Sequence, residues 1–461
     1  MVAIEKSTGI NQTEKVLGQL CDRVFLKAWN YLNPHRPKGK KMRELCDLLA
    51  VFDGHIFIFQ VKQIKFSEEE FDSDAAIKTA WDRWKRKAFT AQLKSLEGAK
   101  NWILNNPKEI YLDPEGKQPF PIDISGGDYK IHKILVAHGA AEACKNFTDQ
   151  NIVGSLGVGY GPQKSDFPYP TPFMLIMDKH DIVHVLDDHN LPIVLGELDT
   201  AWDFTKYLET KEYAIQKFTS TVYCGEEDML ASYISKNFAL TKAPHDLDEK
   251  KATLLLINEG EWEIIRADPA YKLKEKANEI SYWWDNLLQM MCELTLEGGA
   301  QKNRNFFNGP SAIYEMAKEP RAARQTLAEA MHHTFEKQKN TPGKHRYVAL
   351  CKSHYESTAY VFLWEDRPAG SNMNDVEFSQ WRQVLLDVAC GAAKNAYPQY
   401  TKIVGFSYGF AEAGKGKIAL GEFFLQDCEF ALLNCETWTE EQKSDYEEKN
   451  KELKFFKTVR G

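Results

Sequence analysis

Three polar residues close together in the sequence have side chains that could act jointly on a phosphate group: Asp47, Gln60 and Lys62. Carboxylate and amide oxygens are hard donors of the kind that Mg²⁺ binds in proteins. An ammonium group beside such a cation can neutralise charge that develops on a phosphate during hydrolysis. These residue types indicate metal-assisted phosphoryl chemistry, provided that the fold brings them together.

A hairpin centred on Asp53-Gly54 is the element that would position them. Apolar runs rich in β-forming residues flank this dipeptide on both sides, a pattern that predicts two strands joined by a two-residue type I′ turn. Both faces of the strands are apolar over most of their length, which is typical of strands in the middle of a covered sheet.

The register of this hairpin places the polar residues at one end of the sheet. Phe52 faces His55 across the turn, and the same register puts Asp47 opposite Gln60. Lys62 shares the face of Gln60, because alternate residues of a strand lie on the same face. Three polar groups are costly at the end of an apolar sheet unless they serve a site.

A helix predicted over residues 11–32 supplies a candidate fourth member. Its apolar stripe consists of Leu17, Leu20, Cys21, Val24, Phe25, Ala28 and Leu32. Thr13 is the expected N-cap, and Glu14 lies on the stripe, so its carboxylate is expected to face the sheet. A glutamate in the first turn can also serve only to complement the helix dipole. The position alone does not decide between these roles.

This constellation resembles the PD-(D/E)XK nuclease superfamily, which has the restriction-endonuclease-like fold. The helix acid, the strand with Asp47, the twelve intervening residues and the sequence Gln60-Val61-Lys62 are most similar to its Mrr-like branch. The resemblance implies that Asp47, Gln60 and the backbone carbonyl of Val61 bind Mg²⁺ or Mn²⁺. It also implies that Lys62 is the catalytic lysine and that Glu14 adds metal or water contacts.

The chain departs from the family pattern at two positions. Cys46 stands where the motif has proline, and Gln60 replaces an acid. The second change removes one negative charge and is expected to weaken metal binding, with Glu14 compensating. The family core is a helix, three strands, a helix and a strand. The resemblance covers residues 10–140, but the first strand of the trio is not evident before Arg43.

Charge is distributed unevenly along the chain. The 461 residues have a formal net charge of −8, which by itself argues against a nucleic-acid partner. Residues 1–104, however, hold 18 basic and 13 acidic side chains, a net of +5, and the remainder has a net of −13. Because the positive part contains the candidate site, the distribution favours a nucleic-acid partner for the N-terminal region.

Two basic segments adjoin the candidate site. One is a predicted loop with Arg36, Lys38, Lys40, Lys41 and Arg43; the other is a long helix predicted over residues 75–104, with Lys85 and Arg86 among its seven basic residues. A charge run is usually a solvated helix face, but next to a Q-x-K strand it favours a surface that contacts phosphates. Gln92 is the helix position that the resemblance places near the lysine.

We expect an α/β protein of three parts. Residues 1–220 form the restriction-endonuclease-like domain, a mixed sheet flanked by helices with extensions; residues 221–340 form a mainly helical connector; and residues 341–461 form an α+β domain that senses a trigger or binds a partner. The glycines between 154 and 161 match no phosphate loop and predict a loop. His180, His184 and His189 with neighbouring aspartates could form a metal cluster, but the pattern favours a hairpin with polar edges.

The leading hypothesis is a metal-dependent endonuclease that cleaves DNA, in bacterial defence against phage or plasmid DNA; the defence role comes from the resemblance alone. The alternative is a catalytically weak nuclease-fold subunit that binds nucleic acid within a larger complex. A third hypothesis, compatible with either, is that the acidic C-terminal region is a sensor that holds the nuclease inactive. The expected partners are DNA and a second copy of the chain or a partner defence protein. The N-terminus has no apolar run and no segment has the length of a membrane span, so a cytoplasmic protein without membrane contact is expected.

Overall fold

The computed structural model describes residues 3–66, 73–147, 153–162, 171–240, 253–298, 311–339, 346–367, 371–410, 418–420, 423–436 and 438–456. The chain divides into two compact units, Val2–Lys274 and Glu275–Gly461. Each unit contains both sheets and helices, so the mixed α/β class predicted from the sequence is confirmed. Among the helices in these ranges, none combines the length and the apolar character needed to cross a membrane.

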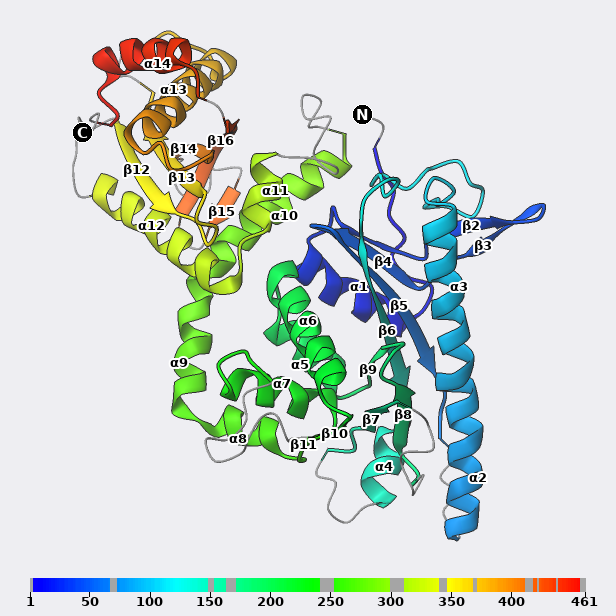
Figure 1. The fold of residues 1–461 in the computed structure, drawn as a ribbon. Coiled ribbons are helices and arrows are strands. Elements are labelled where there is room, and N and C mark those ends of the chain that lie inside the picture. The colour runs from blue at the N-terminus through cyan, green and yellow to red at the C-terminus, as the bar shows by residue number, and fades with distance from the viewer. Residues whose placement is uncertain are drawn as a thin grey trace. The chain divides into compact units, whose positions relative to one another are not determined.

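A five-stranded mixed sheet organises the N-terminal unit (Figure 1). The strand order is β1-β4-β5-β6-β9. Neighbours are antiparallel from β1 to β5, whereas β6 runs parallel to β5 and β9 parallel to β6. The bounds are Asn30–Leu32 for β1, Leu48–Phe52 for β4, His55–Gln63 for β5, Lys130–His138 for β6 and His184–Leu186 for β9.

The predicted hairpin is the centre of this sheet. Asp53 and Gly54 have φ angles of 47° and 81°, as a type I′ turn requires at both central positions. The register runs from Phe52 opposite His55 to Leu48 opposite Phe59, so the predicted pairing is confirmed. β4 is buried along its whole length, and β5 is buried from Ile56 to Phe59.

Helices cover both faces of the sheet (Figure 1). On one face, a π-helical turn (Arg86–Thr90) and α3 (Ala91–Asn105) pack on β5 and β6, and α2 (Asp74–Lys85) precedes them without a break. The predicted long helix is thereby confirmed. On the other face lie α1 (Gln12–Phe25), α5 (Asn190–Glu197) and α6 (Ala201–Lys217). There Phe57 of β5 contacts Phe25 at 4.7 Å and Phe204 at 5.8 Å between ring centroids.

The N-terminal region differs from the prediction in two elements. The helix ends at Phe25 instead of continuing to Leu32, because Leu26 adopts a φ of 57°, outside the helical region. The released segment forms β1, which is the strand that the sequence did not reveal. The basic loop is instead a two-stranded hairpin, β2 (His35–Lys38) with β3 (Lys41–Glu44).

A second sheet completes the N-terminal unit, with strand order β11-β10-β7-β8. Its strands are β7 (Gly157–Gly161), β8 (Met174–Asp178), β10 (Ser220–Cys224) and β11 (Leu254–Ile257), accompanied by α4 (Ala141–Phe147), α7 (Glu226–Ser235) and α8 (Glu261–Ala267). The glycine-rich segment was wrongly predicted to be a loop, because β8 and β10 supply partners for β7 on both sides. The predicted hairpin of β8 with β9 is also wrong, since these strands belong to different sheets.

The C-terminal unit has a five-stranded sheet of order β12-β13-β14-β16-β15. β13 is buried along its whole length, and α13 packs on it and on β14 and β16. The strands are β12 (Arg346–Lys352), β13 (Thr358–Glu365), β14 (Lys402–Phe410), β15 (Ile418–Leu420) and β16 (Phe423–Asn434). The helices are α10 (Tyr282–Leu296), α11 (Ala312–Ala317), α12 (Arg321–Lys339), α13 (Asp375–Ala396) and α14 (Glu440–Leu453), and α9 (Pro269–Asn278) spans the boundary between the units.

Candidate functional site

Asp47 lies directly before β4, and its side chain meets that of Gln60, as the hairpin predicts. Its backbone N–H donates to the carbonyl of Phe59 at 3.1 Å, and Phe59 is also the partner of Leu48, so the register shifts by one residue at Asp47. Its carboxyl oxygen Oδ2 accepts hydrogen bonds from the Gln60 side-chain amide and from the backbone N–H of Val61, the latter at 2.5 Å. Asp47 is only 8% exposed. The carboxylate, the amide and the Val61 peptide therefore meet at the end of β5.

Glu14 lies near this group and faces the interior, as predicted. It is buried, and its Oε2 accepts hydrogen bonds from the backbone N–H of Ile10 at 2.8 Å and from the Asn33 amide at 3.0 Å. The N-cap of α1 is Asn11 and not Thr13, because the Asn11 side chain accepts the Glu14 N–H. The inward orientation of Glu14 is thus fixed by amides from three residues.

Asn33 and Glu44 are two members of the cluster that the sequence analysis did not select. The Asn33 amide nitrogen donates to Glu14 at 3.0 Å and to Glu44 at 3.1 Å, and its backbone N–H donates to the Asp47 carbonyl at 2.9 Å. Asn33 adopts a φ of 50°, a region that asparagine tolerates better than most residues. An asparagine directly before a proline was the one feature of the sequence that could have drawn attention to Asn33. Its hydrogen bonds to Glu14 and Glu44 become evident only when β1 is known.

The pKa of Asp47 depends on burial and on two acidic neighbours. Burial raises the pKa of Asp47 to about 8. The hydrogen bond from the Val61 N–H lowers this pKa, whereas Glu44, which is hydrogen-bonded to Asp47, and Glu14 raise it further. A buried carboxyl with acidic neighbours must be neutralised by a proton or by a cation. The donor set of carboxylate, amide and peptide oxygens suits a hard divalent cation such as Mg²⁺.

Lys62 follows Val61 at the end of β5 and is exposed. Lys62 is two residues beyond Gln60, so the two side chains lie on the same face of β5. Nearer the start of the strand, α3 covers this face. A cavity of about 280 Å³ opens at the same end of the parallel strands, where Lys65 follows β5 and Gly139 follows β6. Lys62 is therefore an exposed residue at the end of β5, near this cavity.

The basic residues of the β2–β3 hairpin form opposed pairs. Arg36 faces Arg43, and Lys38 faces Lys41. Like charges directly opposite each other destabilise a two-stranded ribbon. Lys40 lies in the exposed turn, and Arg36 stacks on Trp102 of α3 at 4.7 Å. The hairpin therefore holds a concentrated positive charge against the α3 side of the sheet, the side to which Gln60 and Lys62 belong.

The long helix carries the other predicted basic residues. Arg86 is exposed in the π-helical turn, and Lys85 lies 6.0 Å from the ring of Trp81. The Gln92 amide donates to the Lys87 carbonyl at 3.1 Å, so in this state it contacts its own helix and none of the motif residues. Trp84 fixes the helix to the end of β5 through a 3.0 Å hydrogen bond to the Ile64 carbonyl.

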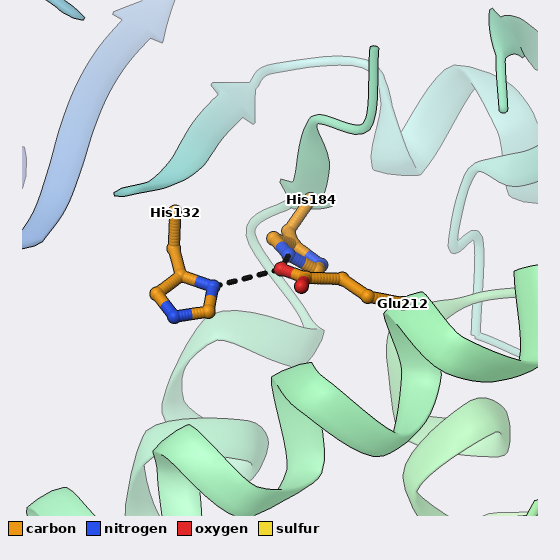
Figure 2. Close-up of side chains that lie close together, drawn as sticks. All are labelled: His132, His184 and Glu212. Carbon is orange, nitrogen blue, oxygen red and sulfur yellow. Dashed lines mark hydrogen bonds and ion pairs between the residues drawn. The ribbon is translucent and has the colours of Figure 1, made fainter. Parts of the chain in front are cut away.

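A second cluster, which the sequence analysis missed, lies on the other face of the same sheet (Figure 2). Nδ1 of His132 in β6 is 2.7 Å from Oε1 of Glu212 in α6, and Nε2 of His184 in β9 is 3.1 Å from the same oxygen. Burial by itself would raise the pKa of Glu212. The hydrogen bonds from both histidines outweigh this effect and hold the pKa well below its usual range. Burial lowers the pKa of His184.

This is the one group of three histidine, cysteine or acidic ligand atoms within 4.8 Å of one another in the part of the chain that the structure describes. Asp47, Glu14 and Glu44 are more widely spaced by that measure, so metal binding there would rely on the Gln60 amide and on a peptide carbonyl. Of His180, His184 and His189, which the sequence analysis considered as a metal cluster and did not favour, only His184 belongs to this group.

Comparisons with known proteins give no match: no family model, no curated protein and no solved structure is similar to this chain.

Proposed function

We propose that the N-terminal unit is a metal-dependent endonuclease of the PD-(D/E)XK type that cleaves DNA phosphodiester bonds. The observation that carries the proposal is the joining of Asp47, Gln60 and the Val61 peptide at the end of β5, one residue before Lys62. Supporting it, the main sheet follows the order expected for this superfamily: a helix, three antiparallel strands, a helix and a parallel strand.

The roles of the residues follow from their positions. Asp47, the remaining amide oxygen of Gln60 and the Val61 carbonyl would hold Mg²⁺ or Mn²⁺, which when bound supplies positive charge to the reacting phosphate. Lys62, exposed on the same face, orients the attacking water and contributes further positive charge. Glu14, anchored by Asn33, adds negative charge behind Asp47 and offsets part of the charge lost through Gln60.

The arrangement of basic residues supports DNA as the substrate. The Arg36–Arg43 and Lys38–Lys41 pairs are unfavourable for the isolated hairpin, and a polyanion would relieve this repulsion. Lys40 adds to the charge of the hairpin, and Lys85 and Arg86 add positive charge next to Trp84, where the long helix meets the end of β5. Phosphate contacts of this kind provide affinity without sequence specificity.

The resemblance to Mrr-like enzymes extends the proposal to bacterial defence against foreign DNA. The C-terminal unit, with its own buried sheet and the long helix α13, would then recognise a trigger, a partner defence protein or a second copy of the chain. Such a unit is expected to restrain cleavage until that signal arrives, in the cytoplasm where the DNA is met.

One observation favours a second candidate function, a nucleic-acid-binding subunit without cleavage. Oδ2 of Asp47 already accepts two hydrogen bonds from within the chain, and the neutral Gln60 offers less attraction to a cation than an acid would. A site satisfied in this way can be stable without metal. This function retains the basic surface and predicts salt-sensitive DNA binding in the absence of hydrolysis.

Plasmid cleavage with Mg²⁺ or Mn²⁺ tests the proposal. Asp47→Asn keeps the shape of the buried side chain, and Lys62→Ala removes the ammonium; each is expected to reduce cleavage by at least about 100-fold, as loss of a charge-stabilising group does. Gln63→Ala is the matched control, because Gln63 is exposed beside Lys62 but lies on the other face of the strand. Cleavage unaffected by Asp47→Asn and Lys62→Ala would refute the assignment. Salt-sensitive DNA binding by wild type, with no cleavage under either metal, would favour the second candidate.

A further inference from the structure

The cluster beneath α6 brings together side chains from three separate elements. His132 comes from β6, His184 from β9 and Glu212 from α6, and their ligand atoms lie within 4.8 Å of one another. Both histidines are almost completely buried, at 1% and 2% exposure. Two imidazoles that approach the same carboxylate oxygen in an apolar interior form a ready donor set (Figure 2).

This cluster is distinct from the candidate nuclease site. His132 pairs with Phe57 in the parallel β5–β6 ladder, and its ring stacks on that of Phe57 with centroids 5.0 Å apart. Phe57 is an odd number of residues from Gln60 and Lys62 along β5, so its side chain lies on the opposite face of the sheet. The histidines lie on the same face as Phe57. The proposed nuclease activity and the chemistry of this cluster can therefore be measured separately.

We propose that His132, His184 and Glu212 bind one Zn²⁺. Two imidazole nitrogens and one carboxylate oxygen are typical zinc ligands, whereas Mg²⁺ prefers an all-oxygen shell. With zinc–ligand bonds of about 2.0–2.1 Å in a tetrahedron, ligand atoms are separated by roughly 3.3 Å. The nitrogen–oxygen separations of 2.7 and 3.1 Å require only a slight opening of the cluster.

The surrounding residues resemble the outer shell of a metal site. Nδ1 of His55 lies 3.0 Å from the second ring nitrogen of His132, which fixes the orientation of that ring. The Lys130 ammonium lies 2.8 Å from the second oxygen of Glu212. Ligands in metal sites are commonly held in this way through their remaining polar atoms. Since Glu212 is partly exposed, water would reach the fourth position from its side.

A structural reason for a metal lies in β9. This edge strand has three residues and pairs only with β6 among the described strands. The proposed ion would join β9 to β6 and to α6, adding a link where backbone pairing is short.

The test uses the full-length chain, purified, stripped with chelator and titrated with Zn²⁺ alone. We expect one tightly bound zinc per chain by elemental analysis, and a higher melting temperature with zinc than without. Glu212→Gln and His184→Gln should lose the bound zinc. His55→Ala should bind it roughly 10- to 100-fold more weakly, as loss of an outer-shell partner does.

Controls separate a metal site from a hydrogen-bonded network. Glu209→Gln is matched to Glu212→Gln, because Glu209 lies one turn away on α6 and also contacts Lys130, at 3.6 Å; it should retain zinc. Asp47→Asn should also retain it, whatever its effect on cleavage. Co²⁺ should give the absorption spectrum of a tetrahedral site in wild type and not in Glu212→Gln. No zinc at saturation in folded wild type, or undiminished zinc in both ligand variants, would overturn the proposal.

Discussion

Two faces of one sheet carry candidate sites of opposite chemical character. At the end of β5, Asp47 is surrounded by amide, peptide and carboxyl groups, which suit a hard cation such as Mg²⁺. On the other face, His132 and His184 supply nitrogen donors and Glu212 a single carboxylate. The same sheet thus combines an accessible end, where Lys62 is exposed, with an interior in which His132 and His184 are buried.

The two sites also differ in how their groups hold protons. In the metal-free protein, burial and acidic neighbours raise the pKa of Asp47 to about 8 from an ordinary value of 3.8. Burial lowers the pKa of His184 below its ordinary value of 6.5. Folding therefore favours the neutral form in both cases, but the neutral form is the protonated one for Asp47 and the deprotonated one for His184.

The largest expected difference between the sites is the pH dependence of stability, measured in chelator. The stability due to Asp47 is present below pH 4 and lost as the pH rises toward 8, by up to about 1.4 kcal/mol per pH unit. The stability due to neutral His184 is present above pH 6.5 and lost as the pH falls below it. Chemical denaturation of wild type, Asp47→Asn and His184→Gln across this range measures both.

Each variant should remove one of these slopes. The stability of wild type relative to Asp47→Asn should decrease between pH 4 and 8, whereas that relative to His184→Gln should decrease below pH 6.5. Gln63→Ala, an exposed change at the end of β5, should leave both slopes in place. Parallel curves for wild type and Asp47→Asn would contradict the described surroundings of Asp47.

The contrast also explains what the sequence could and could not predict. Asp47 and Gln60 are joined by a hairpin whose Asp53-Gly54 turn fixes the register locally, so their meeting followed from the sequence. His132, His184 and Glu212 meet only because β9 joins the sheet beside β6 and α6 packs over both. No local pattern specifies such contacts between distant segments.

The first helix is shorter than its apolar pattern predicts. The apolar stripe of α1 continues in phase past Phe25, so periodicity alone extended the helix to Leu32; the positive φ of Leu26 ends it. Asn33 acquires its role only through the strand that results, where it connects Glu14 with Glu44. The missed members of the site therefore depend on a backbone change that sequence patterns did not signal.

A middle-sized effect is expected at the basic hairpin, whose last residue, Glu44, acts on Asp47. Lys38→Gln with Lys41→Gln removes a pair of opposed charges. DNA binding should weaken about 10-fold at low salt, and the slope of log affinity against log salt should decrease in magnitude by about 2, one per lost phosphate contact. Fluorescence anisotropy with a DNA duplex over a salt series measures both quantities.

The stability of this double variant sharpens the test. Because like charges are opposed in the ribbon, their removal should leave the melting temperature unchanged or raise it. Lys272→Gln with Lys276→Gln, at exposed positions of α9, is the matched loss of two charges and should keep the salt slope. Equal slopes for wild type and the hairpin variant would exclude the hairpin from the DNA-binding surface.

The smallest expected effect is that of Glu44, in contrast to that of Glu212. Glu212 is the only carboxylate of the histidine cluster, so its loss should abolish zinc binding. Glu44 is exposed and acts on Asp47 from outside; an exposed carboxylate contributes about 1 kcal/mol or less, so Glu44→Gln should raise the Mg²⁺ concentration for half-maximal cleavage by roughly 2- to 5-fold. Glu109→Gln, at another exposed position, should not shift it. A complete loss of cleavage in Glu44→Gln would instead make Glu44 a direct metal ligand that replaces the acid missing at Gln60.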